Sequence, residues 1–152
     1  MNRIIVFLIV CLFFLGFTFL APEIFIMPSW YTSKILFINS ALMGSLGGIL
    51  YCLRGVYLNK SVHKRWDKDW HVWYYLRPLT SLISGLVSSI FLRAGLLVLD
   101  AVEGEMSFGY LAVAFIAGYN VDNFLKKIED VAKTIWGIDK SRSSKNSEDK
   151  NS

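Results

Sequence analysis

The chain has 152 residues, of which 54% are hydrophobic and only 18% are charged, whereas soluble domains carry about 25% charged residues. Its apolar residues gather in runs of membrane-span length, which argues against an ordinary soluble domain. The net charge of +4 does not indicate nucleic-acid binding, because the cations lie beside apolar runs, where topology and anionic lipid explain them. We therefore expect an all-α membrane protein.

The first apolar run, residues 4–21, contains no charge and predicts a helix about 27 Å long. It resembles the core of a signal peptide, but cleavage after Ala21 would leave Phe19 where a small residue is needed. We expect an uncleaved signal anchor. A short segment follows, with two prolines and with Trp30 near its end, as is typical of a membrane–water interface.

Two further spans are predicted, over residues 35–53 and 78–99, and a fourth apolar run begins at 107. The fourth run crosses a membrane only if its helix continues to 125, so we predict a span over 107–125 and a membrane domain over 1–125. The loop between the second and third spans is rich in cations, which marks a cytoplasmic loop. These cations are Arg54, Lys60, Lys64, Arg65, Lys68 and Arg77.

The distribution of cations predicts the topology. With four spans and both termini in the cytoplasm, 14 of the 16 Lys and Arg residues lie in cytoplasmic segments or directly beside them. The loop that carries Asp100, Glu103 and Glu105 then lies outside. We expect a multi-pass protein of a bacterial inner membrane with this N-in, C-in arrangement.

Rows of small residues mark the faces by which the spans are expected to pack, because helices in lipid associate through close backbone approach. The packing rows are Ser40, Gly44 and Gly48 in the second span and Ser81, Gly85 and Ser89 in the third. A parallel row of Thr80, Ser84 and Ser88 could instead line a polar pore. Packing within one protomer is favoured, and a homo-oligomer or a pore is the alternative.

Arg93 is the one charge predicted to lie well inside a span. A cation at a helix centre costs about 2.5–3.5 kcal/mol on insertion scales, and snorkelling toward the headgroups lowers that cost. An intramembrane charge is also a functional candidate, so Arg93 joins the pore candidates.

The central loop predicts an interfacial helix over residues 61–76, with Trp66, Trp70 and Trp73 on one face. We expect this helix to lie on the inner leaflet in contact with membrane lipid. A surface for a partner protein is the alternative, because exposed tryptophan is also typical of interfaces.

The same loop places His63, Asp67 and His71 along one strip of that helix, but no further metal ligand is evident. Arg65 and His71 have the loose spacing found in HEPN-type ribonucleases, which is too common to indicate catalysis. The chain has no phosphate-binding loop, HExxH or CxxC motif. We expect no enzymatic activity, no cofactor and no metal.

The apolar residues after the fourth run recur at helical spacing and predict an amphipathic cytoplasmic helix over 121–136, ended by Gly137. Its apolar stripe needs a cover, which the inner leaflet, the tryptophan helix, a second protomer or a soluble protein could supply. The residues expected to bind a partner are Phe124, Leu125, Ile128, Ile135 and Trp136. The polar tail, 137–152, is expected to be disordered.

Two patterns resemble those of uncharacterised small multi-pass bacterial membrane proteins. One runs from Arg77-Pro78-Leu79 through Gly85 to Arg93-Ala94-Gly95, and the other is Phe115-Ile116-Ala117-Gly118-Tyr119 before an amphipathic helix. In size and topology the chain is also similar to bacteriocin-immunity and phage-exclusion membrane proteins. These resemblances imply no activity and assign no functional residue.

Two functions fit these features. The leading one is an oligomeric pore-forming or membrane-perturbing effector, of the defence or stress type. The alternative is a membrane anchor or adaptor, immunity or exclusion types included, that recruits a soluble cytoplasmic protein through the 121–136 helix.

Overall fold

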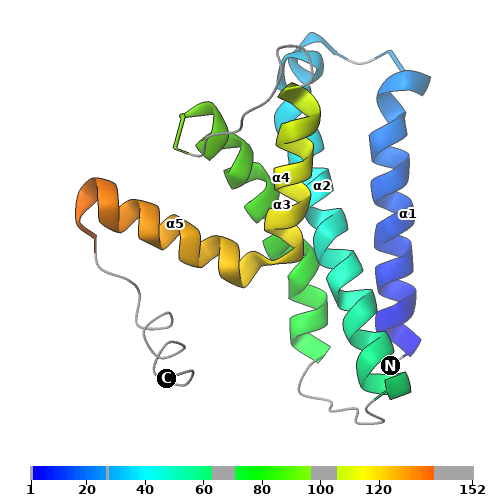
Figure 1. The fold of residues 1–152 in the computed structure, drawn as a ribbon. Coiled ribbons are helices and arrows are strands. Elements are labelled where there is room, and N and C mark those ends of the chain that lie inside the picture. Colours follow the sequence, from blue (N-terminus) through cyan, green and yellow to red (C-terminus); the bar gives the residue numbers. More distant parts are fainter. Residues whose placement is uncertain (1, 27, 63–70, 97–105, 139–152) are drawn as a thin grey trace, which may run out of the picture.

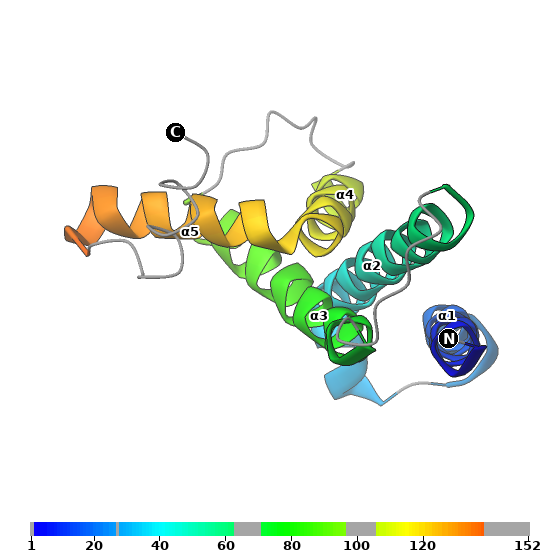
Figure 2. The ribbon, with the colours of Figure 1, turned by 90° about the horizontal axis from the view of Figure 1, so that it is seen from below.

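The computed structural model describes residues 2–26, 28–62, 71–96 and 106–138, and every regular element in these ranges is helical. The elements are α1 (Asn2–Ile24), α2 (Ser29–Tyr57), its π-helical extension η1 (Leu58–Val62), α3 (His71–Arg93), α4 (Met106–Tyr119) and α5 (Val121–Trp136). Helices α2, α3 and α4 pack together, and α1 stands along the outer side of α2 (Figure 1). Helix α5 leaves the end of α4 sideways (Figures 1 and 2).

Three helices, α1, α2 and α3, are long and apolar enough to cross a membrane. The expected all-α architecture is thus present, and these three overlap the spans predicted over 4–21, 35–53 and 78–99. Helix α1 buries Ile4 and Leu8 in the core with Cys52 of α2, while Phe13 and Phe14 are 75% and 68% exposed. Such an uncovered apolar face is typical of a helix that meets lipid.

Glycines form the point where α2, α3 and α4 meet. A Cβ on Gly44 of α2 would lie 2.6 Å from the Cα of Gly85, and a Cβ on Gly118 of α4 would lie 2.6 Å from the Cα of Gly44. Only glycine allows backbones to approach so closely. The small-residue face predicted on α2 and α3 therefore packs within one protomer, and α4 adds a third glycine to it.

Helix α3 is displaced from the predicted third span. It begins at His71, keeps Pro78 inside the helix, and ends at Arg93 rather than near residue 99. Gly95 ends it by adopting a left-handed conformation, with φ 72°. The amides of Gly95 and Leu96 donate to the carbonyls of Leu92 and Phe91, which is the hydrogen-bond pattern of a Schellman cap. The prediction followed apolar composition and did not allow for this cap.

The predicted fourth span over 107–125 is wrong as a continuous helix. Helix α4 ends at Tyr119, and its 14 residues cover about 21 Å, against a hydrocarbon core of about 30 Å. Asn120, with φ −124° and ψ 56°, is not helical and separates α4 from α5. The helix predicted over 121–136 is present as α5 with the predicted bounds, and Gly137, with φ 66°, ends it as expected.

Several predicted features fall outside the described residues. Trp66 and Trp70 lie there, so of the helix predicted over 61–76 only its two ends are seen, within η1 and at the start of α3. His63, Arg65, Asp67, the acidic loop and most of the tail, 139–152, also lie outside.

Candidate functional site

A buried arginine lies where α2, α3, α4 and the start of α5 come together. Arg77 of α3 is only 4% exposed, although the sequence placed it among the cations of the central loop. A charged side chain inside a membrane-type bundle is expensive unless it is paired, so such a residue is a functional candidate. Arg77 takes this role in place of Arg93.

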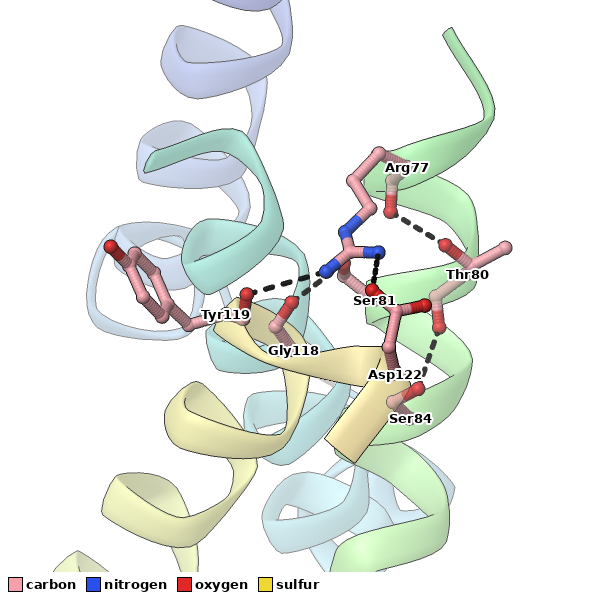
Figure 3. Close-up of polar contacts among 7 residues, drawn as sticks. All are labelled: Arg77, Thr80, Ser81, Ser84, Gly118, Tyr119 and Asp122. Carbon is pink, nitrogen blue, oxygen red and sulfur yellow. Dashed lines mark hydrogen bonds and ion pairs between the residues drawn. The ribbon is translucent and has the colours of Figure 1, made fainter. Parts of the chain in front are cut away.

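Arg77 joins α3 to the junction between α4 and α5 (Figure 3). Its Nη1 donates to Oδ2 of Asp122 at 3.1 Å, and its Nη2 donates to the carbonyl oxygen of Tyr119 at 3.4 Å. The guanidinium carbon lies 4.6 Å from the ring centroid of Tyr51 and 5.0 Å from that of Trp73. Arginine stacks on aromatic faces in this way when it is removed from water. These contacts fix the direction in which α5 leaves the bundle.

Other polar contacts support the same junction. Ser81 Oγ donates to the carbonyl oxygen of Gly118 at 2.8 Å, across the contact between α3 and α4 (Figure 3). Arg54, which is exposed, donates from Nη1 to the hydroxyl of Tyr119 at 2.7 Å. The rings of Tyr51 and Tyr119 meet edge to face, with centroids 5.5 Å apart. We call Tyr51, Trp73, Arg77, Tyr119 and Asp122 the arginine junction.

Two grooves flank the base of α5. One, of about 330 Å³, lies between α5, α4 and the end of α3, and its walls include Phe91, Val113 and Ile128. The other, of about 600 Å³, lies between α3 and α5, with Leu76 and Leu125 among its apolar walls and part of the arginine junction among its polar groups. The first half of α5 therefore lies beside apolar side chains of α3 and α4.

Two of the three residues predicted to line a pore lie inside the helix packing. Ser84 and Ser88 are buried, and their hydroxyls donate to carbonyl oxygens of their own helix, those of Thr80 and Gly85. Thr80 is exposed and donates to the carbonyl oxygen of Arg77. In a single protomer these side chains do not form a continuous polar surface.

Arg93 is an exposed residue at the end of α3, not a charge in the middle of a span. Its guanidinium carbon lies 5.2 Å from the ring centroid of Phe37. The prediction failed because it extended the third span to residue 99. An arginine at a helix end reaches the interface readily.

The predicted packing residues lie where they were expected. Gly44, Gly48 and Gly85 make close backbone or side-chain approaches between α2 and α3, and Ser40, Ser81 and Ser89 are fully buried. A Cβ on Gly48 would collide with the side chain of Ser81. The four-residue spacing was thus a sufficient signal for this contact.

The residues predicted to bind a partner divide into two groups. Phe124 and Ile128 are half-buried in the groove beside α4. Leu125 and Ile135 are each 49% exposed, and Trp136 is 61% exposed. The far end of α5 therefore carries an uncovered apolar surface.

Sequence reasoning missed the arginine junction as a unit. One signal was available: Arg77 directly precedes Pro78 at the start of an apolar run, which places it at or inside a membrane boundary. Nothing local in the sequence pairs it with Asp122, which is 45 residues away. Within the described ranges, no group of three His, Cys, Asp or Glu residues could hold a metal ion.

The comparisons add no relative. No protein-family model, curated protein or solved structure matches the chain.

Proposed function

We propose that the chain is a non-enzymatic, multi-pass membrane protein that acts by self-assembly, as an oligomeric pore-forming or membrane-perturbing effector. The observation that carries this proposal is the position of α5. The helix is amphipathic, yet its first half lies beside Phe91 and Val113, which belong to apolar parts of α3 and α4. Its polar side carries Asp122, Lys126, Lys127, Glu129, Asp130 and Lys133.

A polar helix side that faces lipid needs a polar cover. A charged residue at the membrane centre costs about 2.5–3.5 kcal/mol on insertion scales, and α5 carries six charged residues, so a position that turns them toward lipid is disfavoured. Grouping several copies so that these sides face water or one another removes that cost. In this proposal α5, rather than the row of Thr80, Ser84 and Ser88, lines the polar path.

We also propose a bacterial inner membrane with both termini in the cytoplasm. The support is the distribution of cations, of which 14 of 16 then lie at the cytoplasmic side. This topology makes α4 the fourth crossing although its 14 residues cover only about 21 Å, and it places α5, which leaves sideways after Asn120, at the cytoplasmic side.

The test is ion flux through liposomes that contain the purified full-length chain. We expect flux that depends on protein density. We also expect Lys127→Glu to shift its selectivity toward cations, because the polar side, with three acids and three lysines, then becomes net negative. Ser88→Ala is the matched control, because the Ser88 hydroxyl already bonds within its own helix, so selectivity should not change. Absence of flux in every oligomeric form obtained contradicts the proposal.

A membrane anchor that recruits a soluble protein is the second candidate. The exposed Ile135 and Trp136 favour it, because large apolar side chains at the end of a projecting helix are typical of binding surfaces. Replacing both Ile135 and Trp136 by Ser should then abolish co-purification of a defined partner, whereas Thr134→Ala on the polar side should not. A flux-active chain that purifies without a soluble partner argues for the first candidate.

A further inference from the structure

Four charged residues form one narrow stripe along α5. Asp122, Lys126, Glu129 and Lys133 are spaced by four, three and four residues, so at 100° per residue they lie within about 60° of the helix circumference. Asp122 and Lys133 are exposed, with the Asp122 side chain at 71%, and Lys126 and Glu129 are half-buried. We call these four residues the charged stripe.

The signs along the charged stripe are self-complementary in one orientation only. When two such helices run antiparallel about a point between Lys127 and Ile128, Asp122 of one lies opposite Lys133 of the other, and Lys126 lies opposite Glu129. A two-fold axis repeats each contact, which makes four pairs of opposite charge. In a parallel arrangement every residue would face its own copy, and all pairs would repel.

We propose that the charged stripe binds the same stripe of a second copy of this chain, in an antiparallel two-fold pair. This inference rests on the proposed self-assembly and names its first contact. Helix α5 projects away from α1 and α2 in both views (Figures 1 and 2). Asp122 takes part although Arg77 already donates to it, because a carboxylate accepts several hydrogen bonds.

The charge of the stripe favours a second copy over other occupants. Two acids and two lysines sum to zero, so the stripe as a whole does not attract an anionic lipid surface. Exact alternation about a midpoint is what a two-fold partner requires, whereas an unrelated protein needs no such symmetry. The position of α5 beside apolar helix flanks adds a reason to cover the stripe within the membrane.

A simpler explanation of the same spacing is pairing within the helix. Asp122 and Lys126 are four residues apart, as are Glu129 and Lys133, and each such pair stabilises a helix by about 0.2–0.5 kcal/mol. The two explanations can be distinguished by measuring association, because pairing within the helix does not depend on a second chain, whereas pairing between two stripes does.

The experiment uses two full-length single variants, Lys126→Glu and Glu129→Lys, with mass tags that distinguish them, analysed by native mass spectrometry from nanodiscs. The wild type should be dimeric or a multiple of dimers. Each variant alone places like charges opposite each other twice, and its association should weaken about tenfold or more. Mixing the two variants places opposite charges together again, and a one-to-one heterodimer should form.

Lys34→Glu is the matched control, because it makes the same change of charge at an exposed residue of α2, outside the stripe, and should leave the dimer intact. The proposal is overturned by a monomeric wild type, by unchanged dimers of both stripe variants, or by variants that weaken alone and fail to associate when mixed. The last result would assign the stripe to pairing within the helix. Because flux is measured separately, a chain that conducts without this pairing would refute the stripe contact and leave the proposed function standing.

Discussion

Replacing Gly44 by alanine tests the close contact between α2 and α3 directly. The added Cβ would lie 2.5 Å from the carbonyl oxygen of Ser81 and 2.6 Å from the Cα of Gly85, whereas ordinary contacts begin at 3.4 Å. Both neighbouring atoms belong to the backbone of α3, so α3 must move away from α2 by about 0.9 Å. A gap of that size forfeits a quarter to a half of the dispersion energy of the contacts it opens.

The expected loss of stability follows from two opposing contributions. Overpacking costs about 1–3 kcal/mol at a well-packed site, and here the added atom meets backbone, which cannot turn aside as a flexible side chain can. Alanine in place of glycine returns about 0.5–1 kcal/mol through helix propensity. We therefore expect Gly44→Ala to destabilise the bundle by about 2 kcal/mol.

The measurement is unfolding of the full chain in mixed micelles by increasing the fraction of dodecyl sulfate, followed by circular dichroism. Gly16→Ala in α1 is the control, because no atom lies within 4 Å of the added Cβ, and its stability should stay equal or rise slightly. Equal stabilities of Gly44→Ala and Gly16→Ala would refute the close approach of α2 and α3.

Two further predictions concern the polar contacts of the bundle. Removing the exposed Asp122 should cost more stability than removing the buried Arg77 with which it pairs. Asp122→Ala leaves a buried cation without its counter-charge and should lower the free energy of unfolding by about 3 kcal/mol. Arg77→Met leaves only an exposed carboxylate and should lower it by about half as much. The same unfolding assay checks this order, and a smaller loss for Asp122→Ala would show that water reaches Arg77. Ser81→Ala removes a hydrogen bond of 2.8 Å between helices and should cost about 0.6 kcal/mol, up to 1.7 kcal/mol. Ser88→Ala removes a bond within its own helix and should change stability by less than about 0.5 kcal/mol, so similar losses for the two serine variants would contradict their different roles.

The parts of the fold that could be predicted from the sequence depend on local periodicity. Glycines and serines four residues apart define one helix face whatever the partner, so the face through Gly44 and Gly48 was visible in the sequence. The helix over 121–136 was visible for the same reason, since apolar residues repeat at helical spacing and Gly137 follows them.

The parts that could not be predicted depend on tertiary contacts. Polar residues at 120, 122 and 123 mark the end of the apolar run, but they are also compatible with a continuous helix, so the sequence alone does not reveal that a single residue, Asn120, separates two helices of different direction. Six cations occupy the region between the second and third spans, and although Arg77 adjoins the third apolar run, no local pattern shows that it alone is buried. Its burial follows from Tyr51 and Trp73, which close over the guanidinium only when α2 and α3 are packed.

The break at Asn120 connects the fold to the proposed assembly. If α4 continued as a straight helix to residue 125, the charged residues of α5 would extend beyond the apolar bundle, and no second protomer would be needed to cover them. The break at Asn120 instead directs the amphipathic α5 sideways from the bundle, and the hydrogen bond from Arg77 to Asp122 holds its first turn there. A single protomer therefore presents polar side chains beside apolar helices, an arrangement that lipid disfavours and that a second protomer can satisfy. By this argument, a variant that frees α5 at the arginine junction should lose assembly as well as stability.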